Sequence, residues 1–189
     1  MARAGTTRDT VPAELDDLTL ARAQRGEGPA CRALVERYQR PVFALISRMC
    51  GPMRCEDLAQ ETFLRVFTAL PRFVAPGPAR LSTWILTIAT RLALDELRRR
   101  PLVTAALDDK LAGPGRTDEG ADRRALRAAL QRAVADLSPD QRAVVLLREV
   151  HGLDYDEIAR ALDIDLGTVK SRLHRARAAL RTALEPDHA

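Results

Sequence analysis

Residues 154–177 read DYDEIARALDIDLGTVKSRLHRAR, the pattern of two helices joined by a tight turn. Asp154 and Glu157 have the spacing of a capping box, in which two side chains bond the free backbone N–H groups of a first helical turn. The short first helix runs through residue 162, and its inward face is formed by Ile158, Ala159 and Leu162. Asp163 follows, and aspartate tolerates a left-handed backbone better than most residues. The stretch therefore predicts a helix-turn-helix over residues 155–180.

The second helix, expected over residues 166–184, carries one apolar stripe on an otherwise polar and basic surface. The stripe consists of Val169, Leu173 and Ala176. The other faces carry Thr168, Lys170, Ser171, Arg172, His174, Arg175, Arg177 and Arg181. Such a helix fits the major groove of B-DNA, where its N-terminal half meets base edges and its later arginines meet phosphates. A basic run alone would indicate only a solvated face, but the tight turn and the Gly167-Thr168 start favour DNA binding.

The composition indicates an all-α protein. The chain has 189 residues, enough for one ordinary domain or two small ones. Ala, Leu and Arg are abundant helix formers, and no stretch shows the sustained alternation of a strand. The net charge of +4 is weak evidence by itself. Arginine supplies nearly all the cations and suits phosphate and guanine edges, although a GC-rich genome is the simpler explanation of that bias.

Several classes of protein are excluded by what the chain lacks. Three cysteines are too few, and odd in number, for a secreted disulfide framework. Neither a signal peptide nor an apolar run of membrane-spanning length is found, so we expect a soluble cytoplasmic protein. Cys50 and Cys55 lie near one another, but four zinc ligands cannot be assembled around them, so we expect packed thiols and no metal site. Without a phosphate loop, nucleophile elbow or zinc-protease motif, we expect no enzyme, no catalytic residue and no cofactor.

Helical periodicity divides the chain into two domains. We expect a disordered tail over residues 1–15, a first domain over 16–101, a flexible linker rich in glycine and proline over 102–121, and a second domain over 122–185. Pro41 predicts a kink or local break in the helix that begins near residue 29. Ser82 is expected to cap the helix that follows the loop 71–80.

Two further apolar stripes are expected in the helices on either side of the linker. Before it, the buried stripe is Trp84, Ile88 and Leu92, with Ile85 beside it. After it, the stripe is Leu126, Leu130, Val134 and Leu137. Ser138, Pro139 and Gln141 then give a second capping-box start.

Five short stretches of the chain together closely resemble one protein family. Residues 154–159 (DYDEIA) with 167–177 (GTVKSRLHRAR) resemble region four of the extracytoplasmic-function sigma factors, a subfamily of the bacterial sigma-70 family. Residues 57–67 (DLAQETFLRVF) resemble the core-binding helix of region two in that family. Residues 82–85 (STWI) and 93–99 (ALDELRR) resemble its promoter-melting helix. The resemblance covers roughly residues 16–184 in family order, which makes it more specific than one helix-turn-helix.

The resemblance implies a non-enzymatic transcription-initiation factor built from two small helical domains. In such proteins region two docks on the coiled coil of the polymerase β′ subunit and captures the promoter −10 element as single-stranded DNA. Region four reads the −35 element as duplex and touches the β flap. Relatives are commonly held inactive by an anti-sigma factor. The implied partners are therefore core RNA polymerase, promoter DNA and an anti-sigma factor, with no small-molecule substrate.

The same resemblance assigns candidate residues to each task. The core-polymerase-binding residues are Asp57, Gln60, Glu61 and Leu64. The −10 candidates are Arg72, Arg80, Arg91, Arg98 and Arg99, with Arg91 standing where many relatives have asparagine. The −35 candidates are Thr168, Lys170, Ser171, Arg172, His174 and Arg175, and Arg177 and Arg181 are expected to hold phosphates. Trp84 is expected to be a core residue rather than a platform for base stacking.

Two other kinds of protein compete with this interpretation. A helix-turn-helix regulator that does not replace a sigma subunit would carry a dimerisation or ligand domain in its first half, in place of the acidic helix 57–67. A decoy that binds polymerase or antagonises a sigma factor would keep residues 57–67 and lose the basic helix.

Overall fold

The computed structural model describes residues 14–75, 77, 79–99 and 121–185, and every regular element in these ranges is helical. The first half contains α1 (Asp17–Gln24), α2 (Gly28–Cys50), α3 (Cys55–Ala69) and α4 (Leu81–Arg99). The second half contains α5 (Ala121–Asp136), α6 (Pro139–Val145), α7 (Tyr155–Leu162) and α8 (Leu166–Leu184). The all-α class with two small helical domains is confirmed. The expected linker and most of the expected tail lie outside the described residues.

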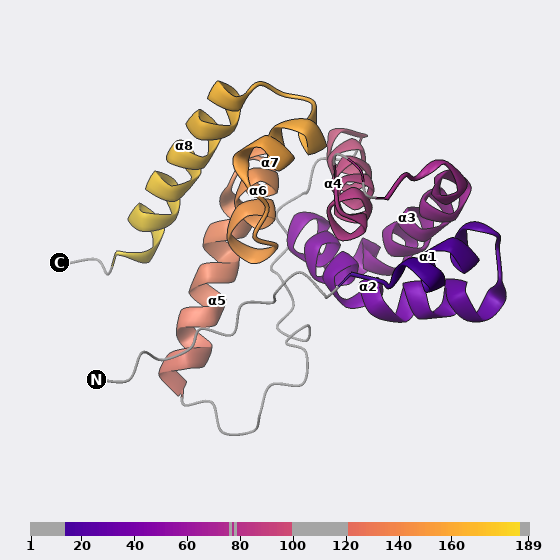
Figure 1. The fold of residues 1–189 in the computed structure, drawn as a ribbon. Helices are drawn as coiled ribbons and strands as arrows, with labels where there is room; N and C mark the ends of the chain where they lie inside the picture. Colours follow the sequence, from indigo (N-terminus) through magenta and orange to yellow (C-terminus); the bar gives the residue numbers. More distant parts are fainter. Residues whose placement is uncertain (1–13, 76, 78, 100–120, 186–189) are drawn as a thin grey trace, which may run out of the picture.

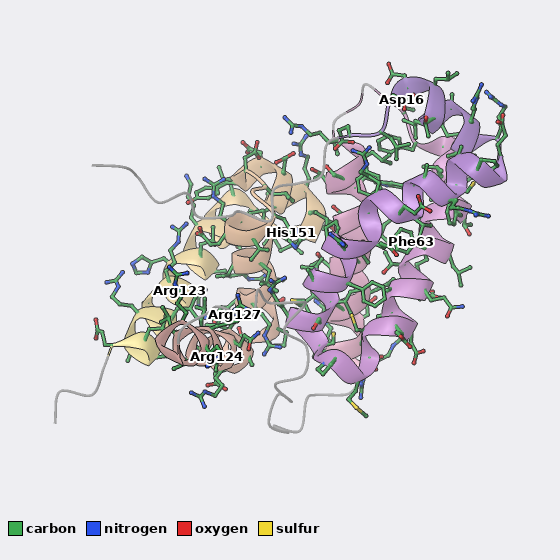
Figure 2. The ribbon with its side chains drawn as sticks, turned by 90° about the horizontal axis from the view of Figure 1, so that it is seen from below. Asp16, Phe63, Arg123, Arg124, Arg127 and His151 are labelled. Carbon is green, nitrogen blue, oxygen red and sulfur yellow. The ribbon has the colours of Figure 1, made fainter. Side chains whose placement is uncertain are left out.

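The two halves pack side by side, with α4 facing α6 and α7 (Figure 1). Helix α8 lies at one edge of the molecule, and α3 lies at the other (Figure 1). In the view from below, Arg123, Arg124 and Arg127 of α5 lie far from Phe63 of α3 (Figure 2). No helix among the described residues is long and apolar enough to cross a membrane.

Helices α1, α6 and α7 begin at a side-chain cap, and the two capping boxes predicted from the sequence are confirmed. Asp16 caps α1, and its carboxylate accepts from the Thr19 N–H at 2.9 Å. The capping boxes at Ser138 and Asp154 both form, so local side chains set the starts of α6 and α7.

The turn between α7 and α8 also has the expected geometry. Asp163 adopts φ 55° and ψ 52°, which places it in the left-handed region. The Ile164 N–H donates to the Ala159 carbonyl at 3.1 Å and closes the end of α7. Asp165 then caps α8 by accepting from the Thr168 N–H at 2.7 Å and from its hydroxyl at 2.6 Å. Both bonds lower the pKa of Asp165, so the cap is a carboxylate.

Helix α2 corrects the expectation at Pro41. The helix runs through Pro41 without a break over 23 residues. Proline removes one backbone hydrogen bond, but Leu34 and Tyr38 before it and Val42 and Leu45 after it are fully or almost fully buried on one face. Burial of this continuous apolar face outweighs one lost hydrogen bond.

The start and buried face of α4 also differ from expectation. The helix begins at Leu81, so Ser82 lies in its first turn and is not the cap. The face that points inward carries Leu81, Ile85, Leu86, Ala89, Leu92 and Ala93. Trp84 and Ile88 are only partly buried because they face α7, whereas α2 and α3 cover the other side. Trp84 packs on Phe73, with ring centroids 5.0 Å apart.

The expected stripe of α5 is buried at one end only. Leu137 is buried and Val134 partly buried, but Leu126 and Leu130 are 63% and 45% exposed. Helix α5 packs on α8 and on α2, and its N-terminal part extends away from the helices of the first half (Figure 1).

One buried arginine joins the two halves. Arg142 of α6 is 4% exposed and donates to the Met49 carbonyl at 2.5 Å, to the Leu137 carbonyl at 3.1 Å and to the Ala135 carbonyl. Met49 lies in the last turn of α2, and Ala135 and Leu137 lie at the end of α5. The guanidinium therefore satisfies carbonyls that have no partner within their own helices. Around it, the apolar core continues from the first half into the second.

We expect Arg142→Met to lower the free energy of unfolding by about 2–4 kcal/mol, because it leaves buried carbonyls unpaired. Chemical denaturation of the whole chain measures the change. Arg132→Met, at an exposed position of α5, is the matched control and should alter stability by less than about 0.5 kcal/mol. Equal stability of the two variants would show that Arg142 does not join the domains.

Asp163→Gly should leave stability within about 0.5 kcal/mol of the original, because relief of left-handed strain offsets the added freedom of the unfolded chain. Asp163→Val should lose about 1–2 kcal/mol, because a β-branched residue resists this conformation. Thermal unfolding compares the two. If both variants were equally stable, the turn would not require the left-handed residue seen here.

Candidate nucleic-acid and polymerase interfaces

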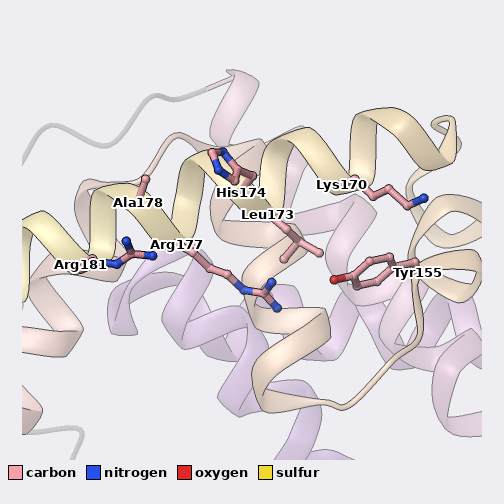
Figure 3. A pocket seen from close by; sticks show the side chains of 7 residues that line it. All are labelled: Tyr155, Lys170, Leu173, His174, Arg177, Ala178 and Arg181. Atoms are coloured by element: carbon pink, nitrogen blue, oxygen red, sulfur yellow. The ribbon is translucent and has the colours of Figure 1, made fainter.

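Helix α8 presents a basic face to solvent. Val169, Leu173 and Ala176 are at most 1% exposed, as the apolar spacing predicts. The exposed residues on the other faces include Lys170, Ser171, His174, Arg175 and Arg181. A shallow groove runs along this face beside Tyr155 of α7, and Lys170, His174, Arg177 and Arg181 line it (Figure 3). The arrangement offers several donors along one helix, which suits a polyanionic groove.

Three other candidate residues of α8 have partners within the protein. Arg172 forms an ion pair with Asp140 of α6 at 3.2 Å. Arg177 donates to Glu149, in the single π turn (Leu146–Val150) after α6, at 2.5 Å, and this bond raises the pKa of its guanidinium. The Thr168 hydroxyl donates to the cap residue Asp165. These contacts hold α8 on α6 and at its own start, and they leave Lys170, His174 and Arg175 facing outward.

Helix α3 presents a surface of different character. Asp57, Gln60, Glu61 and Leu64 share one face at helical spacing, opposite the buried Ala59, Phe63 and Val66. Asp57 and Gln60 are exposed, and Leu64 is 56% exposed. Glu61 accepts from Arg65 of the same helix at 2.7 Å. An acidic face with one exposed leucine repels phosphate and suits a basic or apolar protein surface.

The five arginines expected at the −10 element fall into three places. Arg72 and Arg80 are exposed at the two ends of the loop before α4. Arg98 and Arg99 are exposed at the far end of α4, about 27 Å along the helix axis, and Arg98 pairs with Asp95 at 3.3 Å. The structure therefore does not bring all five together.

Arg91 lies in the middle of α4 and is bound to the other domain. Its guanidinium donates to the Ala161 carbonyl at 2.9 Å and to the Arg160 carbonyl at 3.3 Å, at the end of α7. On the same side, the Thr83 hydroxyl donates to Glu157 at 3.2 Å. The cleft around these bonds is lined by Trp84, Thr87 and Ile88 of α4 and by Arg160 of α7. Helix α7 therefore faces the outward side of α4.

The cysteines are structural in this fold. All three are free, and Cys50 and Cys55 are buried, with their sulfurs near the carbonyls of Ala93 and Phe43. Burial raises the pKa of the Cys50 thiol to about 11 and also raises that of Cys55. Among the described residues no group of His, Cys, Asp and Glu side chains is placed to hold a metal. The thiols are packed, as expected from the sequence.

Sequence reasoning missed three residues that organise these surfaces. Arg142 joins the domains, Glu149 holds Arg177, and Glu14 binds the start of α4. Helical spacing gives a signal for Arg142, because it follows the cap Ser138 by one turn on the face that includes Val145 and Leu146. No local signal marks Glu14, because its partner Ser82 lies 68 residues away.

Both halves match models of one protein family. Residues 34–101 match the model described as Sigma-70 region 2, and residues 127–180 match the model described as Sigma-70, region 4. The region 2 match argues against a regulator whose first half is a dimerisation or ligand domain, and the region 4 match argues against a decoy that lacks the basic helix.

Curated relatives match over most of the chain. The ECF RNA polymerase sigma factor SigC of Mycobacterium tuberculosis is 36% identical over 169 residues, which cover 87% of this chain and 89% of that protein. The ECF RNA polymerase sigma-E factor of Escherichia coli is 33% identical over 183 residues, which cover 90% and 95%.

Solved structures share the fold. CnrH, solved in complex with the cytosolic domain of CnrY, has a TM-score of 0.65 and 24% identity over 90% of this chain and 97% of its own. The sigma factor RpoE of Bartonella quintana, solved with the anti-sigma factor NepR, has a TM-score of 0.66 and 22% identity over 83% and 98%. These two structures show that the fold is shared. The two family models match the two halves of the chain in the expected order, and the relatives exceed 30% identity, which leads to one conclusion. The chain belongs to the extracytoplasmic-function sigma factors of the sigma-70 family.

Proposed function

We propose that this sigma factor divides promoter recognition and polymerase binding among the exposed faces of α3, α4 and α8. As a sigma factor it is not an enzyme, because RNA is made by the polymerase to which it gives promoter specificity. The observation that carries the division is the contrast between two exposed faces: the acidic, leucine-bearing face of α3 and the basic face of α8. They lie on opposite sides of the molecule (Figure 1), so one chain can hold a protein and a duplex at once.

The basic face of α8 is proposed to read the −35 element. Lys170, Ser171, His174 and Arg175 are exposed on the first three turns, which supports the proposal that they contact base edges. Thr168 and Arg172 support them through the cap and through Asp140. Arg177 and Arg181 lie further along and are proposed to hold phosphates, Arg177 while its Nε and Nη2 remain bonded to Glu149.

The acidic face of α3 is proposed to bind core polymerase. Asp57, Gln60 and Glu61 would meet the coiled coil of β′, with Leu64 as the apolar contact. Region four would touch the β flap. Residues 16–101 and 122–185 are the proposed domains, joined by residues 102–121, and the two family matches lie within these proposed limits.

Binding of the −10 strand is proposed for the loop 72–80 and α4. Arg72 and Arg80 flank the loop, and Arg98 and Arg99 offer phosphate contacts at the other end of the helix. Arg91 is held by α7 in this structure. We therefore propose that α7 leaves α4 before Arg91 binds DNA, and that the two domains separate when polymerase and promoter are bound.

An anti-sigma factor is proposed to control this chain. The structures with a similar fold include the sigma factor RpoE of Bartonella quintana bound to the anti-sigma factor NepR. A partner that holds the two domains together would keep Arg91 on α7. Because polymerase and chromosome share the bacterial cytoplasm, we propose that compartment for the chain.

Run-off transcription with purified core polymerase tests the function as a whole. The template library is randomised separately at −10 and −35, and no anti-sigma factor is added. We expect initiation that depends on this chain at a defined subset of templates. Absence of core-dependent initiation on every template would refute the proposal.

Arg175→Ala should weaken binding to the preferred −35 duplex by about 1–3 kcal/mol and reduce discrimination at one position. Arg181→Ala should weaken all duplexes alike and lower the salt dependence by about one unit of slope. Fluorescence anisotropy over a salt series, with preferred and random duplexes, measures both. If Arg175→Ala weakened binding to the preferred and the random duplex equally, Arg175 would be a phosphate contact only.

Leu64→Ala should weaken the affinity for core polymerase roughly tenfold, because an exposed leucine at the centre of an interface is desolvated on binding. Leu18→Ala is the matched control, because Leu18 is 60% exposed on α1 and lies outside the proposed face. Competition against a labelled sigma factor measures both affinities. Equal affinities of the two variants for core polymerase would contradict the assignment of the polymerase-binding site to α3.

A further inference from the structure

The loop before α4 is anchored at its first residues by α1. The side-chain amide of Gln24, the last residue of α1, donates to the Phe73 carbonyl at 2.7 Å and to the Leu70 carbonyl at 3.2 Å. Gln24 is half-buried, and these are its side chain's two bonds to a segment 46 and 49 residues away. The amide holds the point where the short turn after α3 (Leu70–Arg72) gives way to the loop.

The other end of the loop is anchored by the segment before α1. The Glu14 carboxylate accepts from the Ser82 hydroxyl at 2.5 Å and from the Ser82 N–H at 3.3 Å. It thereby occupies the N-terminus of α4, where N–H groups lack helical partners and a negative charge is favoured. Tyr38 of α2 donates to the same carboxylate at 3.4 Å and accepts from the Leu15 N–H at 3.3 Å.

Gly77, between these anchors, lies in a tight turn. The Phe73 and Trp84 rings meet across the base of the loop. A Cβ at Gly77 would lie 2.3 Å from the Val74 carbonyl oxygen, so the turn accepts only glycine there. Both ends of the loop 72–80 are therefore held by hydrogen bonds, one from α1 and one from the segment before it. Residues 76 and 78 of the loop lie outside the described residues.

We propose that Gln24 and Glu14 are positioning residues that fix the geometry of the −10 recognition loop and thereby its selectivity among −10 sequences. The inference rests on the proposed function, in which the loop 72–80 binds the −10 strand. Neither residue touches DNA in this scheme. They act by holding the loop ends at a set separation, because a base pocket discriminates only when its walls are preorganised.

The test uses holoenzyme assembled from core polymerase and the full chain. Gln24→Glu keeps the size of the side chain but replaces its donor by an oxygen that faces two carbonyls. Glu14→Gln removes the charge from the start of α4. The matched controls are Gln39→Glu and Glu36→Gln, at exposed positions of α2. A double variant, Arg72→Ala with Arg80→Ala, reports whether the loop contacts −10 DNA at all.

The readout is the preference for the best −10 sequence over single-base substitutions, measured beside the same preference at −35. For Gln24→Glu we expect a roughly three- to tenfold loss of −10 preference, as for the loss of one or two hydrogen bonds, with the −35 preference unchanged. Glu14→Gln should act in the same direction, and the controls should not differ from the original chain. Thermal unfolding and core affinity are measured for every variant.

The outcomes separate the inference from the proposed function. If the double arginine variant alters −10 preference and Gln24→Glu does not, the positioning role is wrong while the loop assignment survives. Equal loss of −10 and −35 preference, in step with lower thermal stability, would make Gln24 a residue of general stability and overturn the inference. If the double variant leaves −10 preference unchanged, the loop assignment fails and the inference fails with it.

Discussion

The buried guanidinium of Arg142 is the constraint on which the arrangement of the two domains depends. A cation removed from water is costly unless its donors are satisfied, and burial lowers the pKa of Arg142 accordingly. No carboxylate is bonded to it among the described residues; its bonded partners are carbonyls at the ends of α2 and α5. Helix C-termini carry a partial negative charge, so the site is favourable only while α2, α5 and α6 remain together.

Arg91 also donates to carbonyls at the end of a helix in the other domain, but from the first domain to the second. Arg142 reaches from the second domain to the end of α2, and Arg91 reaches from α4 to the end of α7. Both arginines bond carbonyls, but Arg91 is exposed as a residue whereas Arg142 is buried. A phosphate oxygen with a full charge is a stronger partner for a guanidinium than a carbonyl. In the proposed function, promoter DNA would compete with α7 for Arg91, and the α4–α7 contact would be easier to exchange than the buried contact of Arg142.

Sequence reasoning succeeded where the controlling interactions are local. Ser138 and Asp154 cap helices through residues three positions away, and Asp163 forms the turn at the end of α7, so spacing alone predicted the starts of α6 and α7 and the turn before α8. It failed where the neighbouring helix decides. Which face of α4 is buried depends on α2, α3 and α7 packing on different sides, and periodicity could not choose Ile85 and Ala89 over Trp84 and Ile88. The exposure of Leu126 likewise depends on how α8 and α2 pack on α5. The candidate residues of α8 were found because its stripe is local, whereas Glu14 needs a contact 68 residues away.

The partners of Arg172 and Arg177 give the candidate DNA-binding face its orientation. Each ion pair is partly exposed, and such pairs contribute little to stability. The two pairs instead fix the position of α8. Asp140 lies at the start of α6 and Glu149 in the π turn after it, and they hold α8 at Arg172 and Arg177, five residues apart. Together with the buried Val169, Leu173 and Ala176, these points allow one rotation of α8 about its axis. Lys170, His174 and Arg175 are then exposed in a fixed register. Base readout requires a fixed register, because a side chain displaced by about one ångström loses a directional hydrogen bond.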